Sequence, residues 1–568
     1  MLRKSLIVLS LLSVSLSAMG TLGSTPEQKK AKPQTFLWNN ATVYFLLTDR
    51  FNNADKGNDL AYGRQADGAP LRGFMGGDLK GIIAKIKDGY FERLGVNALW
   101  MTPPVEQIHE GTDEGTGKSY GFHGYWARDF TKVDANLGTD KDFKNLVDIA
   151  HQHGIRVLLD VVMNHTGPVT VSDTAWPADW ARTEPTCDYQ SADGAIKCTL
   201  VKNLPDFLTE SDKAVELPPF LAQKWKQEGR YEREVKELEV FFGRTGFPRA
   251  PRYYLMKWQT DWIRKYGVDG FRVDTVKHVE AAVWKELKSE ASVAYEEWKQ
   301  AHPKSRLSDD AFFMTAEAYN YPIRDGLLFR MDGGSRINYY ANGFDSMINF
   351  GFKSDAHLPY ETLFSQYSSY LSGELKNYSV LNYISSHDDG FPFDPARVQP
   401  FVAATKLMLS PGSAQIYYGD ETARLLNVNE AQGDAKLRSM MNWTALQKNL
   451  PIASTQSAQT KQTTRDLLSH WQKLGQFRRA HVAVGAGLHQ QISATPYVFK
   501  RSYQRDGVSD TVIVALDLPV AKVHQIDVSG VFLDGEKLHD YYSGKSGIVK
   551  AGKFELPGQH SIILIGKP

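Results

Sequence analysis

The segment with the most chemical information reads GFRVDTVKH and spans residues 270–278. Its first half is short and apolar, which is typical of a buried parallel strand. Arg272 and Asp274 are two residues apart and therefore project to the same side of that strand. A guanidinium beside a carboxylate favours the charged form of the acid, which a carboxylate nucleophile requires. Taken alone, such a pair is more often a structural ion pair than an active site.

Two other apolar segments also end in acids. AFFMTAEAY, residues 311–319, contains Glu317, and SVLNYISSHDD, residues 379–389, ends in His387, Asp388 and Asp389. In a barrel of alternating strands and helices, the C-terminal ends of the strands converge on one mouth. One ionised and one protonated carboxyl group on opposite sides of a bond are what glycoside hydrolysis needs. Asp388 and Asp389 are adjacent, so only one of them can point into such a cleft from a regular strand.

The elements that would position these acids follow a regular order. Helical patterns cover residues 253–266 and 281–299, on either side of the segment with Arg272. Strand-like apolar runs occur at Val43–Leu47, Val96–Met101, Val157–Val162, Gly270–Val273, Phe312–Thr315, Phe344–Phe350, Val380–Ser385 and Ala414–Tyr418. Eight strands alternating with helices predict an α/β fold of the (β/α)₈ barrel type.

Two regions fall outside this alternation. Residues 166–251, between the third strand and its helix, are too long for a simple connection and predict a small inserted domain. Residues 486–568 follow a helix at 467–479 and read as short strands with turns, which predicts a C-terminal antiparallel β-sandwich. The barrel would then comprise residues 39–165 and 252–485.

Composition limits the possible functions. The chain has 568 residues, which predicts two or three domains, and 42% of them are hydrophobic. Its formal net charge of +1 provides no basic field for nucleic acid and suits a neutral substrate. Aromatic residues make up 12%, which is compatible with stacking on sugars.

The N-terminus predicts export. Residues 1–20 combine Arg3 and Lys4, an apolar run over residues 6–16 and a small-x-small ending, as in a secretory signal peptide, with residues 21–38 as a leader. The alternative is a membrane anchor, but the run is short for a bilayer span. The destination is the periplasm or the medium. In an oxidising compartment Cys187 and Cys198 are expected to form one disulfide across a loop, with two free thiols as the alternative.

Several separated motifs together resemble glycoside hydrolase family 13, the α-amylase family. In chain order they are GGDLKGI at 76–82, GFHGYW at 121–126, DVVMNH at 160–165, NLPDF at 203–207, GFRVDTVKH at 270–278, AEAY at 316–319 and ISSHDD at 384–389. The resemblance runs from about Asn39 to the C-terminus. It implies an exported α-amylase, a retaining endo-hydrolase of α-1,4-glucosidic bonds in starch, glycogen and maltodextrins.

Two alternatives share the scaffold. One is a maltooligosaccharide-preferring hydrolase or a 4-α-glucanotransferase, in which sugar instead of water reaches the same intermediate. The other is a non-catalytic binding member of the family, although such members lose the acids that are present here. The expected partner in every case is an α-glucan, and we expect a monomer without a membrane span.

The resemblance and the chemistry together assign roles to the acids. Asp274 would be the nucleophile, kept charged by Arg272, and Glu317 the general acid and base. Asp388 would stabilise the oxocarbenium-like transition state, because it follows His387 as in the family.

The sugar contacts come from the resemblance. His165, His387 and Tyr125 would surround the sugar next to the scissile bond, with His123 and Trp126 as further candidates. Lys277 and His278 would contact the sugar on the leaving-group side. For each of these residues the alternative is a packing or solvated role.

The resemblance also implies a calcium ion. Asn164, Asp206 and the backbone carbonyl of His278 would bind it, since hard cations take oxygen ligands. Asp188 is a candidate for a further ligand. The segment NLPDF lacks the acid or amide that often follows it in the family. Ser386 stands where chloride-activated members carry Asn, so we expect no chloride.

Overall fold

The computed structural model describes residues 35–113, 115–452, 461–505, 507–519 and 521–568. By its internal contacts the chain divides into Met1–Thr35 and Phe36–Pro568, and every element named below belongs to the second part. The predicted signal peptide and nearly all of the predicted leader therefore lie outside the described residues. Within the described ranges, no helix combines the length and apolar character that a membrane span needs.

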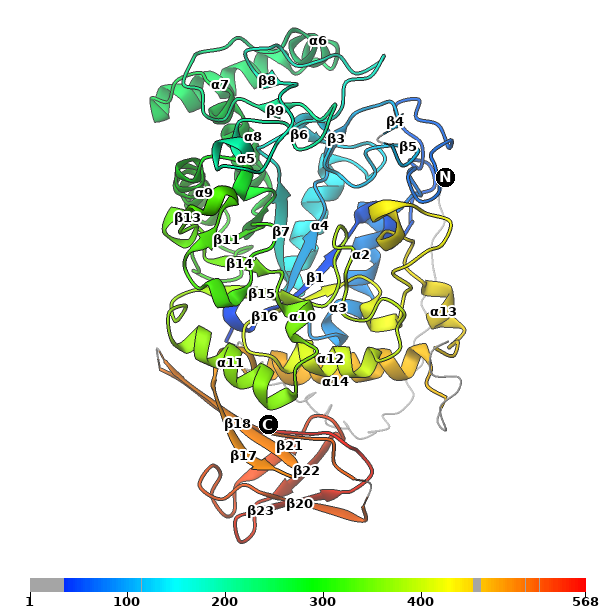
Figure 1. Ribbon diagram of the computed structural model, residues 1–568, viewed down its shortest axis with the longest axis vertical. Coiled ribbons are helices and arrows are strands. Elements are labelled where there is room, and N and C mark those ends of the chain that lie inside the picture. Colours follow the sequence, from blue (N-terminus) through cyan, green and yellow to red (C-terminus); the bar gives the residue numbers. More distant parts are fainter. Residues whose placement is uncertain (1–34, 114, 453–460, 506, 520) are drawn as a thin grey trace, which may run out of the picture. The chain divides into compact units, whose positions relative to one another are not determined.

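The predicted (β/α)₈ barrel is confirmed (Figure 1). Eight parallel strands close in the order β1-β16-β15-β14-β11-β10-β7-β2. They span β1 Thr42–Leu46, β2 Ala98–Met101, β7 Arg156–Val161, β10 Gly270–Val273, β11 Phe313–Ala316, β14 Ser346–Asn349, β15 Ser379–Tyr383 and β16 Ser413–Tyr417. All eight coincide with apolar runs of the sequence to within three residues at each end, because strands buried on both faces must be almost continuously apolar.

Helices cover the outside of the barrel. The longer ones are α2 Leu79–Lys87, α4 Asp140–Gln152, α8 Pro251–Tyr266, α9 Ala281–Ala301, α11 Tyr360–Ser372, α12 Pro400–Leu409 and α14 Thr464–Ala480. Thr139 and Thr463 begin α4 and α14 with capping boxes, in which the threonine hydroxyl and an acid three residues later satisfy two free amides. Short helices α1 Thr48–Phe51, α3 Tyr90–Arg93, α10 Phe352–Asp355, α13 Trp443–Gln447 and α15 Ala483–Ala486 fill the connections.

The insertion between β7 and α8 has little regular sheet. It contains β8 Ala181–Arg182, α5 Asp193–Ile196, β9 Asp206–Phe207, α6 Pro219–Gln227 and α7 Tyr231–Thr245. Its core is aromatic: Trp180 and Trp225 are buried, and the Trp180 ring stacks on Trp258 of α8 at 5.9 Å between centroids. The insertion is therefore packed onto the barrel by apolar contacts. The hairpin-like pairs β3 Val105–Gln107 with β6 Ala127–Val133, β4 Thr112–Asp113 with β5 Lys118–Ser119, and β12 Phe329–Arg330 with β13 Arg336–Ile337 lie in other barrel loops.

The C-terminal part consists of antiparallel strands, as predicted. A six-stranded sheet has the order β17-β18-β19-β24-β21-β22, and β20 pairs with β23. These strands are β17 Leu488–Ala494, β18 Tyr497–Arg505, β19 Val508–Leu516, β20 Val523–Asp527, β21 Lys537–Asp540, β22 Lys545–Ile548, β23 Lys553–Pro557 and β24 Ile563–Gly566. Their apolar side chains form a core of their own, with Ile513, Phe554 and Ile565 fully buried.

Candidate active site

The register of three neighbouring barrel strands brings the site together. Arg272 on β10 lies opposite Asp160 on β7, and Val273 lies opposite Ala316 on β11. Asp274 and Glu317 each follow that last pair by one residue. Parallel strands in this register place the two acids side by side where the strands end, at the face of the barrel that carries active sites.

One guanidinium contacts three carboxylates at this point. Arg272 Nη1 lies 2.6 Å from Asp274 Oδ1 and 2.9 Å from Asp160 Oδ1, and its Nη2 lies 3.2 Å from Glu317 Oε2. The Arg272 side chain is 1% exposed. A delocalised, always charged and planar group is suited to hold several carboxylates in a fixed arrangement.

The pKa values of Asp274 and Glu317 are shifted in opposite directions. Burial alone would raise the pKa of the Asp274 carboxyl, but the charge and hydrogen bond of Arg272, together with His165 and His387, outweigh burial and hold that pKa below its usual range. Burial raises the pKa of Glu317 well above its usual range, and the charges of Asp274 and Asp388 add to this against the opposing Arg272. The backbone amide of Thr275 donates to Glu317 Oε2 at 2.8 Å and fixes its position. The site thus favours the charged form of Asp274 and the protonated form of Glu317.

Asp388 and Asp389 have different environments. Asp389 accepts from Tyr383 Oη at 2.6 Å, from the Phe391 amide and from Lys353 Nζ, so its oxygens are engaged away from the other acids. Within the described ranges, the Asp388 carboxylate pairs with the His387 ring alone, at 3.6 Å, and its side chain is 34% exposed. Its partial burial in the barrel mouth and the charge of Asp274 raise the pKa of Asp388 to about 6, although Arg438 and Arg272 oppose the rise. Asp388 is therefore the acid that is open to a ligand.

The predicted sugar-binding residues His165, His387 and Tyr125 lie around this group. The Tyr125 ring stacks on the His387 ring, with 5.4 Å between ring centroids. The Tyr125 hydroxyl donates to Asp160 Oδ2 at 2.8 Å. Burial lowers the pKa of His165, and burial and Arg438 lower that of His387, which leaves both imidazoles neutral near pH 7. Neutral imidazoles beside charged acids can exchange hydrogen bonds with sugar hydroxyls.

The remaining predicted sugar contacts are His123 and Trp126, and the pair Lys277 and His278 that follows β10. His123 is 7% exposed, and its Nδ1 accepts from the Tyr125 amide at 3.1 Å. Trp126 is 4% exposed and packs with Ile108 and Leu204 in a small separate cluster. Lys277 and His278 lie in the 3₁₀ turn Val276–His278, which follows the amide that holds Glu317.

Two residues of the site were not among the sequence-derived candidates. Asp160 accepts from Trp100 Nε1 at 3.0 Å as well as from Tyr125 and Arg272, and burial raises its pKa to about 7. Its place in the motif DVVMNH was a usable signal. Arg438 donates from Nε to the His387 carbonyl at 2.9 Å and pairs with Asp434 at 2.6 Å. The segment around Arg438 has no apolar run or acid motif that could have indicated this position.

Within the described ranges, two buried oxygens of the residues predicted to hold calcium have no hydrogen-bond partner, Asn164 Oδ1 and Asp206 Oδ1. The β-bridge between His165 and Asp206 brings these residues together, and Asp206 Oδ2 lies 3.0 Å from Arg182 Nε. Burial raises the pKa of Asp206 to about 9. The charges of Glu210 and Glu280 add to this rise, and the charge of Arg182 opposes it. Buried amide and carboxylate oxygens without partners fit a hard cation.

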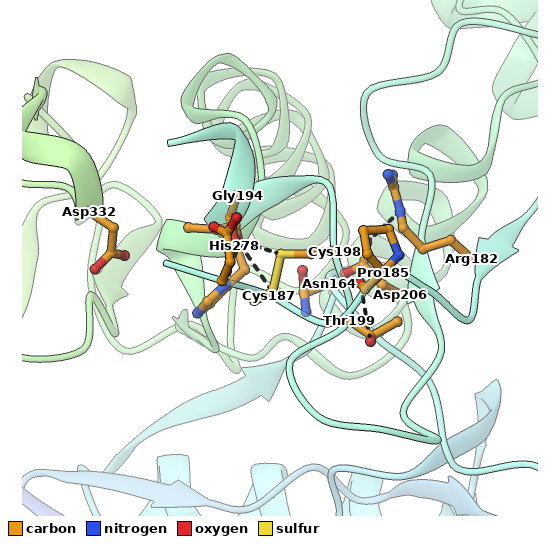
Figure 2. The surroundings of a disulfide bond; sticks show 12 residues. Asn164, Arg182, Pro185, Cys187, Gly194, Cys198, Thr199, Asp206, His278 and Asp332 are labelled. Atoms are coloured by element: carbon orange, nitrogen blue, oxygen red, sulfur yellow. Dashed lines mark hydrogen bonds and ion pairs between the residues drawn. A yellow bond between two sulfur atoms is a disulfide. The ribbon is translucent and has the colours of Figure 1, made fainter. Parts of the chain in front are cut away.

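Other features of this region limit that donor set. Figure 2 shows Asn164, Asp206 and His278 around the Cys187–Cys198 disulfide. Asp188 is exposed, and its Oδ1 accepts from the Gln190 amide at 2.9 Å, so it serves its own loop. Across the described ranges, no cluster of three or more His, Cys, Asp or Glu side chains is arranged to hold a metal. The predicted set is of another kind, with one amide, one carboxylate and one backbone carbonyl.

Comparison with known proteins gives consistent matches. Residues 45–487 match the family model for the alpha amylase catalytic domain. The chain is 36% identical over 538 residues to the periplasmic alpha-amylase of Escherichia coli K12, and the alignment covers 84% of this chain and 72% of that protein. It is 28% identical over 540 residues to a cyclomaltodextrin glucanotransferase of Geobacillus stearothermophilus, and this alignment covers 91% of this chain and 66% of that protein.

Solved structures share the fold. An alpha-amylase from Anoxybacillus superposes with a TM-score of 0.60 at 22% identity, covering 94% of this chain and 99% of that one. An alpha-amylase from Geobacillus thermoleovorans, in complex with acarbose, superposes with a TM-score of 0.61 at 20% identity and the same coverage.

Proposed function

Because the chain belongs to the α-amylase family of glycoside hydrolases, we propose that it is an α-amylase that cleaves α-1,4-glucosidic bonds within starch, glycogen and maltodextrins. The observation that carries this proposal is the contact of one guanidinium, that of Arg272, with Asp274 and Glu317 at once. It holds the two carboxyl groups side by side, while burial and the neighbouring acids raise the pKa of Glu317 and Arg272 helps to lower that of Asp274. A double-displacement glycosidase requires such a pair of one proton donor and one carboxylate.

In the first step the Asp274 carboxylate attacks the anomeric carbon while Glu317 donates its proton to the glycosidic oxygen. The carbon–oxygen bond to the leaving sugar breaks, and a glycosyl ester of Asp274 forms. In the second step Glu317, now a carboxylate, takes a proton from a water molecule whose oxygen attacks the same carbon and releases Asp274. Two displacements retain the anomeric configuration.

The surrounding residues act on the sugar next to the scissile bond. Asp388 supplies negative charge to the oxocarbenium-like transition state from an exposed position in the site. His165, His387 and Tyr125 hydrogen-bond or stack against the same ring, while His123 supports Tyr125. Trp126 would reach sugar only at its edge, given its buried position.

Calcium would be held by Asn164, Asp206 and the carbonyl of His278. It would join the inserted domain to the strand end that carries Asp274, and its chemistry is structural charge neutralisation. The unpartnered oxygens of Asn164 and Asp206 support this assignment.

Export is proposed on three grounds. The first 20 residues have the pattern of a signal peptide, and the E. coli relative is named a periplasmic enzyme. The predicted disulfide between Cys187 and Cys198 is present, which suits an oxidising compartment.

A second candidate is a 4-α-glucanotransferase or a maltooligosaccharide-preferring hydrolase. It is favoured by the similarity to a cyclomaltodextrin glucanotransferase over 91% of this chain. Transfer and hydrolysis share the glycosyl ester and differ in whether sugar or water attacks it.

The test is incubation of the mature protein with soluble starch and, in parallel, with pullulan. Reducing ends and product sizes are followed, and Asp274→Asn is the control. Rapid loss of long starch chains, absent in the variant, supports endo-hydrolysis centred on Asp274. Intact starch with redistribution of short maltodextrins supports the transferase. No activity on any α-glucan rejects both.

A further inference from the structure

Asp389, the residue that follows Asp388, takes part in a buried ion pair. Its carboxylate pairs with Lys353 of the short helix α10, and the two side chains are 3% and 14% exposed. Within the ranges that the structure describes, neither side chain has another oppositely charged partner. A buried ion pair adds little stability over apolar residues of similar size, because both charges lose their water on folding. The pair is therefore a candidate for a role in the reaction.

The helix that carries Lys353 is fixed to the barrel strands. Asn349, the last residue of β14, accepts from the Gly351 amide at 3.2 Å, just before α10 begins. The Asn349 side-chain amide donates to Asn382 Oδ1 of β15 at 2.8 Å. The ammonium group of Lys353 thus reaches Asp389 from a base that two neighbouring barrel strands hold in place.

Asp389 ties together the segment on which Asp388 stands. Its Oδ2 accepts from Tyr383 Oη at 2.6 Å, and its Oδ1 accepts from the Phe391 amide at 3.1 Å. Tyr383 ends β15 and is buried, with its ring perpendicular to that of Phe350 at 5.6 Å between centroids. One carboxylate therefore links the end of the strand to the turn after Asp388. Because the two acids are adjacent, a displacement of Asp389 would also displace Asp388.

The same pair determines part of the charge around Asp388. The titratable groups that face Asp388 from other elements are Arg272, Asp274, Glu317, Tyr319, Tyr383 and Arg438. On its own segment Asp388 has His387 and Asp389, and the charge of Asp389 adds to the rise of the Asp388 pKa that burial causes. Lys353 places a positive charge against Asp389. Seen from Asp388, a paired lysine and aspartate largely cancel, whereas an unpaired Asp389 would favour the protonated form of Asp388.

We propose that Lys353 is a positioning residue for the glycosidase reaction, which holds and neutralises Asp389 so that Asp388 stays in place and charged beside the sugar. Lys353 acts through Asp389 and not through the substrate. The inference rests on the proposed function and adds to it a residue outside the group of acids around Arg272. A charged Asp388 is needed when positive charge develops on the sugar, so the contribution of Lys353 belongs to the transition state.

The experiment is a double-mutant cycle of Lys353→Met and Asp389→Asn. Values of kcat and KM for maltoheptaose are measured between about pH 4 and about pH 9, and the acid limb of kcat/KM reports the acids that must be ionised. Lys353→Met leaves Asp389 unpaired, so the acid limb should move up by about one pH unit. Asp389→Asn removes the negative charge and leaves Lys353, so the limb should move down. In the double variant both charges are absent, and the limb should return to within about 0.3 units of wild type.

Further readouts separate this role from a merely structural one. Lys353→Met should lower kcat about tenfold while KM changes less than about threefold, as for an interaction that acts only in the transition state. Lys353→Arg keeps the charge and should keep the acid limb in place. Lys288→Met is the matched control, because it breaks the ion pair of Lys288 with Asp345, which precedes β14 at the opposite end of the barrel. It should leave the acid limb unmoved.

Opposite shifts of the two single variants that cancel in the double variant support the inference. Acid limbs of both single variants within about 0.3 units of wild type, or a double variant shifted as far as Lys353→Met, overturn it. Thermal melting shows whether each variant is folded. If Lys353→Met does not fold, Asp389→Asn decides, and an acid limb that stays or moves up overturns the inference. A wild-type protein that hydrolyses no α-glucan instead rejects the proposed function.

Discussion

Replacement of Arg272 by Met is expected to disable the site without removing Asp274 or Glu317, the two carboxyl groups proposed to act in catalysis. The guanidinium lies 2.6 Å from Asp274, 2.9 Å from Asp160 and 3.2 Å from Glu317, and its side chain is 1% exposed. Met fills a similar volume but carries no charge. The variant would therefore contain three buried carboxyl groups with no cation among them.

The magnitude follows from the nucleophile's contact. Two unit charges about 4 Å apart attract by about 4 kcal/mol at an effective dielectric constant near 20. If the transition state loses that much support, kcat/KM falls about 10³-fold. In wild type the Arg272 charge lowers the pKa of Asp274 and opposes the rise of the Glu317 pKa. Without that charge both pKa values increase. Both limbs of the pH profile should therefore move to higher pH, because both acids become harder to ionise.

The assay is kcat/KM on a maltooligosaccharide between about pH 5 and about pH 9, with circular dichroism and thermal melting to verify the fold. Arg272→Lys is the matched control, because it keeps the charge and loses the planar fork, and it should retain more activity than Arg272→Met. Adding Asp160→Asn to Arg272→Met removes one unpaired charge and should recover stability but not activity. Activity of Arg272→Met within about tenfold of wild type, with an unmoved pH profile, would refute this account of the site.

Three further predictions follow from particular contacts. In wild type the Arg438 charge opposes the rise of the Asp388 pKa, which is about 6. Arg438→Met removes that charge, so the acid limb of the kcat/KM profile should move to higher pH. An unchanged acid limb would contradict this role of Arg438. Exhaustive chelation should lower the melting temperature and activity together, and Asn164→Ala should make melting insensitive to added calcium; an unchanged melting temperature after chelation argues against the site. Gly475→Ala places a Cβ 1.9 Å from the Leu94 carbonyl oxygen and should destabilise the fold by about 1–3 kcal/mol in chemical denaturation. Its control, Gly243→Ala, meets nothing within 4 Å in helix α7 and should be neutral or slightly stabilising, so equal losses in both would reject the packing argument.

The barrel and its acids could be predicted from the sequence because both depend on local patterns. A parallel strand covered on both faces must be an apolar run, and eight such runs alternate with helical segments. Arg272 and Asp274 share one side of their strand through the two-residue period alone. Glu317 and Asp388 were identified because each follows such a run. The disulfide was predicted from two cysteines that lie close together in a chain for which export was predicted, and it is present.

The electrostatic properties of the site were decided by the tertiary structure. Asp160, Arg272 and Glu317 are far apart in the chain and meet only through the register of β7, β10 and β11. Arg438 comes from a loop after the last barrel strand. Asp388 and Asp389 differ only in which partners surround them once the chain is folded. A pKa depends on burial and on charges a few ångströms away, and closure of the barrel sets those distances.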